Sequence, residues 1–536
     1  MKNSQVLNFE DYERGLAHIG STQTLESALL QNQAAQHAQE LNTSVKEKYF
    51  RFLNDNCQES KTEARHFIQT QLDKISKNCE DLNSEYLPRD YAELKTWISD
   101  NAEEVGQQYH QYLIERASGK PRRLFKNKSH ALNFLKLVAP TKMVDGAWLH
   151  GFINHPNEER FAKLINIYLD ELGNGDVHKN HVVLFRQLLT KYGFEDLADL
   201  PDALFVQGAI QLALGCNTEA FAPEIVGFNL AYEQLPLHLM ITAYELKELN
   251  IDPYYFTLHI TVDNALTGHS KQAIDAFRDC LPKIGNQEDY FKRVISGMAL
   301  NQDGLSTMSI IGSYDIDNEI VEIFKQKSTL GKYMHGDHCS IGGKTVNTWL
   351  ADPQDIPEFL QALQKNNWIT RHEDPKNSRF WKLIESDKAV MFGVFSQYEK
   401  QVIYDWIAGT ALETLPRVER LGQSINIFAR KELTKNVANQ DIAHNNALTI
   451  QPSNIIKMEL AKKTSVSQAS NQVNESKPNN LSAIEDETLF NSKVERTKDK
   501  AELLTLLTHW MSPANHHSHL GLIATRFYIA HLDDLR

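Results

Sequence analysis

Cysteine is scarce in this 536-residue sequence, and its five residues are scattered along the chain. They are Cys57, Cys79, Cys216, Cys280 and Cys339. An odd count without a Cys-x-x-Cys pair predicts neither a disulfide framework nor a zinc site made of thiolates. Also missing are an apolar signal core near the start and an uninterrupted apolar run of the ~20 residues that a membrane span needs. We therefore expect a cytoplasmic protein without membrane contacts.

Positively charged residues are also fewer than negatively charged ones: the chain has 56 lysines and arginines and 69 aspartates and glutamates. The net charge of −13 argues against a broad phosphate-binding surface, so no nucleic-acid partner is expected. A local basic run, Gly119–Lys128, is better explained as a connector between domains. Hydrophobic residues make up 41% of the chain, which is enough to build packed cores, and the length predicts two or three domains.

Helical periodicity dominates the sequence and predicts an all-α protein. The predicted segments are an extra helical N-terminal region (1–118), an apolar helical bundle (119–325), a smaller mixed C-terminal region of helices and short strands (326–434), an Asn/Ser/Lys-rich flexible linker (435–495) and a helical tail (496–536). Apolar helices of the second segment follow one another with short turns, as in an antiparallel bundle that encloses a core. We expect the tail to dock on the body or on a partner.

The stretch YLDELGNGDVHKNHVVLF, residues 168–185, interrupts an apolar helix with a Gly-Asn-Gly turn. Two glycines within three residues disfavour a continuous helix, since glycine loses the most backbone entropy there. Glu171 is therefore expected near the end of one helix and His181 near the start of the next. Such a break lets a carboxylate and an imidazole ten positions apart converge on one point. The alternative is a plain helix end followed by exposed histidines.

A second apolar stretch, PYYFTLHITVDNAL, places His259 and Asp263 four positions apart. This spacing puts an imidazole and a carboxylate on one face of a helix, among hydrocarbon side chains. A buried charge needs a compensating partner, which is either a metal ion or a simple His–Asp hydrogen bond. His269 lies off that face of an ideal helix, and a bulge near Gly268 would bring it back.

A further acidic residue, Glu233, interrupts a mostly apolar run just before Pro236. Its burial is costly unless it is bound, whereas N-terminal capping of a helix explains the competing Glu224. Oxygen and imidazole ligands without thiolate favour iron or manganese over structural zinc, and six ligands suffice for two metals that share carboxylates. The candidate ligands are Glu171, His181, Glu233, His259, Asp263 and His269.

The motifs ELGNGDVHKNHVVLF, YEQLP and LHITVDNALTGH resemble those of iron-containing redox enzymes in the haem-oxygenase-like di-iron oxidase and oxygenase superfamily. The resemblance covers about residues 130–325 and implies an all-α, haem-oxygenase-like helical bundle. It assigns metal-ligand roles to Glu171, His181, Glu233, His259 and Asp263. The sequence departs from the family at Leu266, where a histidine is expected, and His269 follows three residues later. Asp145, in VDGAWLHGF, is the weaker counterpart of an acidic ligand that some members carry in an earlier helix.

The resemblance further implies that two iron ions activate O2 to oxidise a small-molecule metabolite. The implied partners are that substrate, O2 and an unidentified electron donor, while manganese and a homodimer stay open. Two other interpretations of the bundle remain. One is a metal-independent enzyme of thiaminase or cofactorless oxidase type, for which Cys216 is the best-placed thiol. The other is a non-enzymatic helical scaffold that binds proteins.

Two more histidine clusters stand apart from these motifs. The run MHGDH holds His335, Asp337 and His338 in a loop bounded by glycine, and a polar turn is favoured there over another metal site. The run NHHSH, residues 515–519, lacks a carboxylate anchor and is interpreted as surface sequence.

Overall fold

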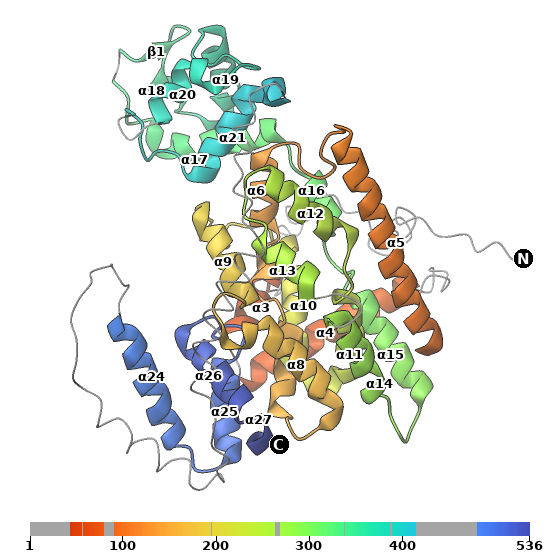
Figure 1. Ribbon diagram of the computed structural model, residues 1–536. Coiled ribbons are helices and arrows are strands. Elements are labelled where there is room, and N and C mark those ends of the chain that lie inside the picture. Colours follow the sequence, from red (N-terminus) through yellow and green to blue (C-terminus); the bar gives the residue numbers. More distant parts are fainter. Residues whose placement is uncertain are drawn as a thin grey trace, which may run out of the picture.

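The computed structural model describes residues 43–55, 57–79, 91–194, 196–262, 268–336, 338–385, 389–413 and 480–536. Helices dominate the described residues, which confirms the predicted all-α helical bundle (Figure 1). Within the described ranges the strands β1 (Ser340–Ile341) and β2 (Lys344–Thr345) pair as one small antiparallel sheet. Among the helices of these ranges, none combines the length and apolarity needed to cross a membrane.

Three helices of the N-terminal region pack directly on the bundle. They are α3 (Val45–Asn54), α4 (Gln58–Cys79) and α5 (Tyr91–Ala117). A capping box starts α3, because the Ser44 hydroxyl accepts from the Glu47 N–H and the Glu47 carboxylate accepts from the Ser44 N–H. Helices α3 and α4 pack against α10 (Val206–Cys216), and α5 packs against α12 (Leu237–Glu248). The N-terminal helices therefore share one core with the bundle.

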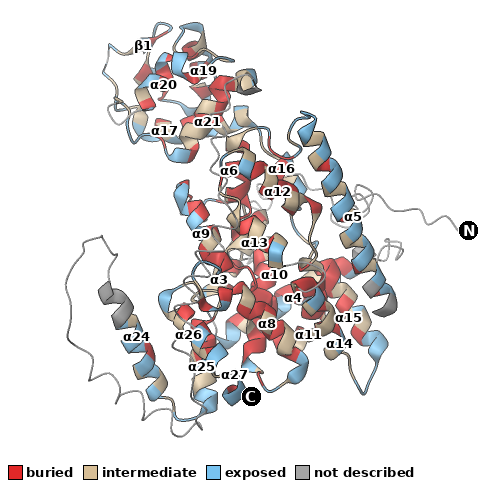
Figure 2. Cartoon of the chain, viewed as in Figure 1, coloured by how far each residue is buried: buried red, intermediate tan, exposed pale blue. Residues whose placement is uncertain are grey.

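The bundle surrounds the most buried part of the molecule, which Figure 2 shows around α8 and α10. Its other α-helices are α6 (Lys128–Leu137), α7 (Ala139–Lys142), α8 (Ala162–Glu171), α9 (His181–Lys191), α11 (Thr218–Tyr232), α13 (Tyr254–Val262), α14 (His269–Asp279), α15 (Gln287–Leu300) and α16 (Thr307–Gly312). Short 3-10 helices join them: η1 (Ala147–Asn154), η2 (Glu159–Phe161), η3 (Gly173–Gly175) and η4 (Asp202–Phe205). Their apolar faces meet in a continuous core, as the sequence pattern predicts.

A buried carboxylate fastens the connection between α5 and α6 onto α12. Glu245, which is 0% exposed, accepts hydrogen bonds from the backbone N–H groups of Arg123 (2.5 Å), Leu124 (3.1 Å) and Phe125 (2.8 Å). The Tyr112 hydroxyl of α5 donates to it as well, at 2.9 Å. Four N–H and O–H donors thus satisfy this carboxylate, and its role is structural.

The smaller C-terminal region lies at one end of the bundle (Figure 1). It contains α17 (Ile316–Gly331), α18 (Val346–Trp349), η5 (Pro353–Asp355), α19 (Ile356–Lys365), η6 (Pro375–Asn377), α20 (Arg379–Ile384), α21 (Gln397–Ala408) and η7 (Gly409–Glu413). Helix α21 contacts α6 through the buried Asp405, which accepts from the Ser129 N–H at 2.7 Å and from the Gln401 amide at 2.9 Å. Burial raises the pKa of Asp405 to about 6, because so few donors offset its desolvation.

The tail forms α24 (Asn480–Glu495), α25 (Lys500–Trp510), α26 (His519–Ala530) and α27 (Leu532–Leu535). Residues 435–479 of the expected linker lie outside the described residues, and its last part is helix α24 rather than flexible chain. That part folds because Phe490 is 1% exposed and packs its ring against those of Trp510 (centroids 5.0 Å apart, tilted) and Phe527 (5.4 Å, edge-to-face). Helix α25 packs against η1 and α26 against η3, so the tail docks on the body.

Candidate metal centre

The turn between Glu171 and His181 brings the two side chains together. Helix α8 ends at Glu171 and α9 begins at His181, as the glycines of the turn predict. Gly173, Asn174 and Gly175 all have positive φ angles, of 66°, 53° and 78°. A Cβ on Gly173 would lie 2.4 Å from the Asn180 backbone nitrogen, so only glycine allows this tight return.

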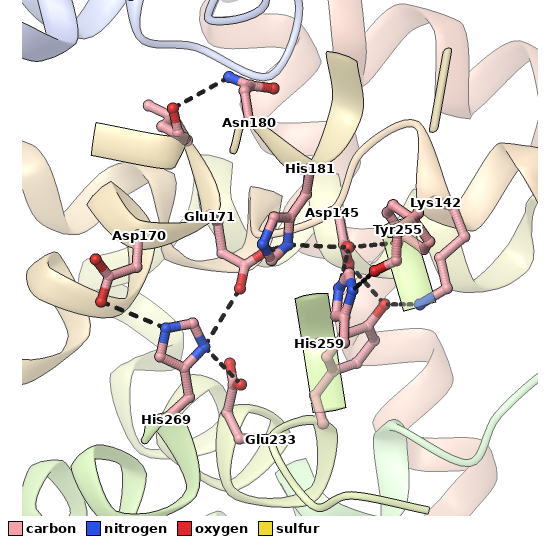
Figure 3. A network of polar contacts seen from close by, with 12 residues as sticks. Lys142, Asp145, Asp170, Glu171, Asn180, His181, Glu233, Tyr255, His259 and His269 are labelled. Carbon is pink, nitrogen blue, oxygen red and sulfur yellow. Dashed lines mark hydrogen bonds and ion pairs between the residues drawn. The ribbon is translucent and has the colours of Figure 1, made fainter. Parts of the chain in front are cut away.

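A first group of candidate ligands collects around His181. It consists of Asp145, Glu171, His181 and His259, whose nearest ligand atoms all lie within 4.8 Å of one another (Figure 3). The His181 Nδ1 atom lies 2.5 Å from Glu171 Oε2 and 3.8 Å from Asp145 Oδ2. His259 Nε2 lies 3.1 Å from the same Asp145 oxygen. All four residues are buried.

A second group shares Glu171 with the first and adds Glu233 and His269. His269 Nδ1 lies 3.2 Å from Glu233 Oε2 and 3.4 Å from Glu171 Oε1 (Figure 3). Glu171 therefore directs one carboxylate oxygen, Oε2, at the first group and the other, Oε1, at the second. A carboxylate in this position can bridge two cations.

The outer nitrogens of two histidines are held by hydrogen-bond acceptors. His259 Nδ1 donates to the Tyr255 carbonyl oxygen at 2.8 Å, and His269 Nε2 lies 3.4 Å from Asp170 Oδ2. A proton on the outer nitrogen suits these oxygen acceptors and would leave the inner nitrogen free to bind a cation. Histidines that bind metal in proteins are oriented in the same way.

The charge of the cluster favours a cation. Three buried carboxylates, from Asp145, Glu171 and Glu233, lie within it. Burial alone would lower the pKa of His181, but Glu171 and Asp145 outweigh that effect and raise the pKa to about 10. The Glu171 Oε2 and His181 Nδ1 atoms are buried without a hydrogen bond of good geometry, although they are in close contact. A divalent cation fits this set of oxygen and imidazole donors, which suits iron or manganese.

Asp145 is oriented by two tyrosines. Tyr232 and Tyr255 donate their hydroxyls to Oδ1 (2.8 Å) and Oδ2 (2.7 Å), and Lys142 Nζ lies 3.0 Å from the Tyr232 hydroxyl. Burial raises the pKa of both tyrosines well above the usual range, and Asp145 raises it further, so both stay protonated donors. For Asp145 itself, the charge of Lys142 and the histidine contacts overcome burial and hold the pKa well below the usual value.

The structure brings five of the predicted ligands together and adds Asp145, the weaker candidate. The five are Glu171, His181, Glu233, His259 and His269. Asp263 and the departing position Leu266 lie outside the described residues. His269 does not return through a bulge in one helix, because it is the first residue of the separate helix α14.

The position of Asp145 in the sequence provides no reason to prefer it as a ligand. It precedes the 3-10 helix η1, where no helical periodicity relates it to the other ligands. The adjacent Gly146 has a φ of 80°, and a Cβ there would lie 2.9 Å from the Glu171 Cβ. Gly146 therefore allows the chain beside Asp145 to approach Glu171 this closely.

Several residues considered as alternatives have other partners. Glu224 is not explained by helix capping, because Arg293 donates to both of its oxygens, at 2.6 and 2.7 Å. Burial raises the pKa of Cys216 to about 11, which argues against a thiolate nucleophile at neutral pH.

The two histidine runs outside the centre differ from each other. In the described part of the MHGDH loop, His335 bonds to the Gly331 carbonyl, as expected of a polar turn. His516 of the NHHSH run is wrongly predicted as surface, since it is 1% exposed.

A cavity of about 290 Å³ opens beside the centre. Its lining includes the candidate ligands His181 and His269, together with Asp170, Leu258 and Thr261. The mixture of apolar and polar walls next to candidate metal ligands is typical of a pocket for a small molecule.

The fold and site define a helical bundle with a buried carboxylate–histidine centre that could hold metal. Residues 132–301 match the model of the iron-containing redox enzyme family, which confirms the resemblance seen in the sequence. The matched segment covers less than half of the chain and contains every residue of both ligand groups. No curated protein and no solved structure matches the chain.

Proposed function

We propose that this chain is a non-haem di-iron oxidase or oxygenase that oxidises a small-molecule metabolite. One observation carries the proposal: the two oxygens of Glu171 face two different groups of buried ligands. A single carboxylate shared in this way is the arrangement that two neighbouring metal ions need. The match to an iron-containing redox family supports iron as the metal.

The residues of the two groups would hold one ion each. Asp145, His181 and His259 would bind the first ion, Glu233 and His269 the second, and Glu171 both. The iron ions would supply the reductive activation of O2, with electrons from a donor yet to be identified. Asp170 fixes the ring of His269, and Tyr255 fixes both the ring of His259 and the carboxylate of Asp145.

The surrounding bundle protects the reaction. Phe256, Tyr255 and Phe185 are almost fully buried near the first group and keep bulk water away from it. A dry site limits side reactions of a strong oxidant. The adjacent cavity of about 290 Å³ is where we place a small substrate, within reach of His181 and His269.

Iron binding by the metal-free, full-length protein tests the proposal. Anaerobic titration with ferrous iron should give one ion for each of the two groups, and exposure to O2 should then consume O2. Glu171→Ala should abolish both binding events, because both groups lose a ligand. Glu224→Gln is the matched control, since it alters a buried carboxylate that lies outside both groups. Failure of the wild-type protein to bind iron or consume O2 would refute the proposal.

A further inference from the structure

The C-terminal tail contacts the segment that links Glu171 to His181. The Arg526 guanidinium of α26 donates to the carbonyl of Gly175, inside the turn, at 2.6 Å. A Cβ on Gly175 would lie 2.7 Å from the Leu522 carbonyl oxygen, so helix and turn are in direct backbone contact. The turn that brings the two ligands together is therefore packed on one side by α26.

A second contact reaches the start of α9, one residue before His181. Asn180 is 0% exposed and caps α9 by accepting from the Val183 N–H at 3.1 Å. Its amide nitrogen donates to His516 Nδ1 of the tail at 3.0 Å and to the Leu172 carbonyl at 3.3 Å. Asn180 thus joins the end of α8, the start of α9 and the tail through one side chain.

A third contact holds α8 itself. The Tyr168 hydroxyl, three residues before Glu171, donates to the Met511 carbonyl of the tail at 2.5 Å. The three contacts lie before, within and after the turn, and each joins residues more than 300 positions apart. The tail lies outside the residues 132–301 that match the redox family, so that match assigns no role to it.

We propose that the tail is a working part of the metal centre, in which His516 and Arg526 are positioning residues for His181 and Glu171. The inference rests on the proposed function, because it assumes that these ligands bind metal. His516 fixes Asn180 and hence the first turn of α9, which carries His181. Arg526 fixes the turn that sets the distance between His181 and Glu171.

Ferrous-iron affinity, measured anaerobically against a competing chelator, tests this role. His516→Leu removes the imidazole acceptor at 3.0 Å and leaves Asn180 only the longer contacts to the Leu172 and His516 carbonyls, so iron binding should weaken about tenfold, as removal of groups that orient ligands commonly does. His516→Gln keeps an acceptor and should recover most of the affinity. Arg526→Met, which removes the guanidinium but keeps most of the aliphatic chain, should weaken binding less, and Arg526→Lys should restore it.

Tyr528→Phe is the matched control. Tyr528 is a buried residue of α26 whose hydroxyl donates to the Ile153 carbonyl at 3.0 Å, away from the turn. Its loss should lower the melting temperature without changing iron affinity. If His516→Leu and Arg526→Met lower only the melting temperature, as Tyr528→Phe does, the positioning role is wrong while the proposed function stands. A wild-type protein that binds no iron would overturn both proposals.

Discussion

Glu171 and Glu245 are both buried carboxylates of the same bundle, yet their partners differ in kind. Glu245 is surrounded by N–H and O–H donors, which satisfy its charge and tie three segments together. Glu171 faces imidazole nitrogens and lies in a cluster with two more carboxylates. Burial of an acidic residue therefore does not identify a metal ligand; the chemistry of its neighbours does.

The largest expected effect is the loss of one of the two iron ions, which distinguishes the two ligand groups that share Glu171. His259→Ala removes a ligand of the first group alone, and His269→Ala removes one of the second group alone. Each variant should lose one of the two irons and keep the other, because Glu171 and the remaining ligands are unchanged. Anaerobic iron counts measure this. Loss of both irons in each variant would show that the groups do not bind metal separately.

Glu245→Gln should lower stability without changing iron binding, whereas the ligand variants should lose iron. The amide places an NH2 group against the N–H donors of residues 123–125, so the free energy of unfolding should fall by about 3 kcal/mol. Iron stoichiometry should stay at the wild-type value. Denaturant unfolding together with an iron count checks both statements. A variant that folds normally but loses iron would remove the distinction between the two carboxylates.

Asp405 offers a third, intermediate environment with few donors. Its pKa is raised to about 6, so between about pH 4 and 6 the folded state binds a proton that the unfolded chain releases. The free energy of unfolding should therefore fall through this window as pH rises, by at most about 3 kcal/mol. Asp405→Asn should lose this contribution. The measurement is the free energy of unfolding of wild type minus that of the variant at each pH. This difference removes the contribution of histidines that titrate in a similar pH range, because both proteins share them.

The smallest expected effect concerns support of a ligand rather than the ligand itself. Tyr255→Phe removes the hydroxyl that donates to Asp145 Oδ2 and leaves the ring packing intact. Iron affinity of the first group should fall about tenfold, which is about 1.4 kcal/mol. The second group should be unaffected. Equal affinity in variant and wild type would mean that the His259 and Tyr232 contacts suffice to orient Asp145.

Sequence alone could predict those candidate ligands whose positions follow local rules. Glu171 and His181 flank a glycine turn, and His259 lies in a short apolar helix, so backbone propensities and periodicity reveal them. Asp145 has no such local relation, because packing of η1 beside α8 brings it to the site. His516 was misjudged for the same reason: its burial depends on α26, which docks on a turn more than 300 residues earlier.

The fold shows the same division. Apolar periodicity predicts the all-α class and the bundle. The same reasoning places α24 in the flexible linker, because the sequence before it is polar. Contacts with the rest of the tail hold it, chiefly the rings of Phe490, Trp510 and Phe527 and the ion pair of Asp486 with His519. Such long-range partners carry no signature in a local window of sequence.

The contact between the tail and the Gly-Asn-Gly turn can form only late in synthesis, after the candidate ligands have been made. All described candidate ligands precede residue 270, whereas His516 and Arg526 leave the ribosome about 250 residues later, after roughly 10–50 s of elongation. Throughout that interval the nascent bundle has its ligands but not the helix that braces them. If the tail positions His181 and Glu171 as proposed, tight metal binding would require the finished chain, and a product truncated before residue 516 would bind metal weakly.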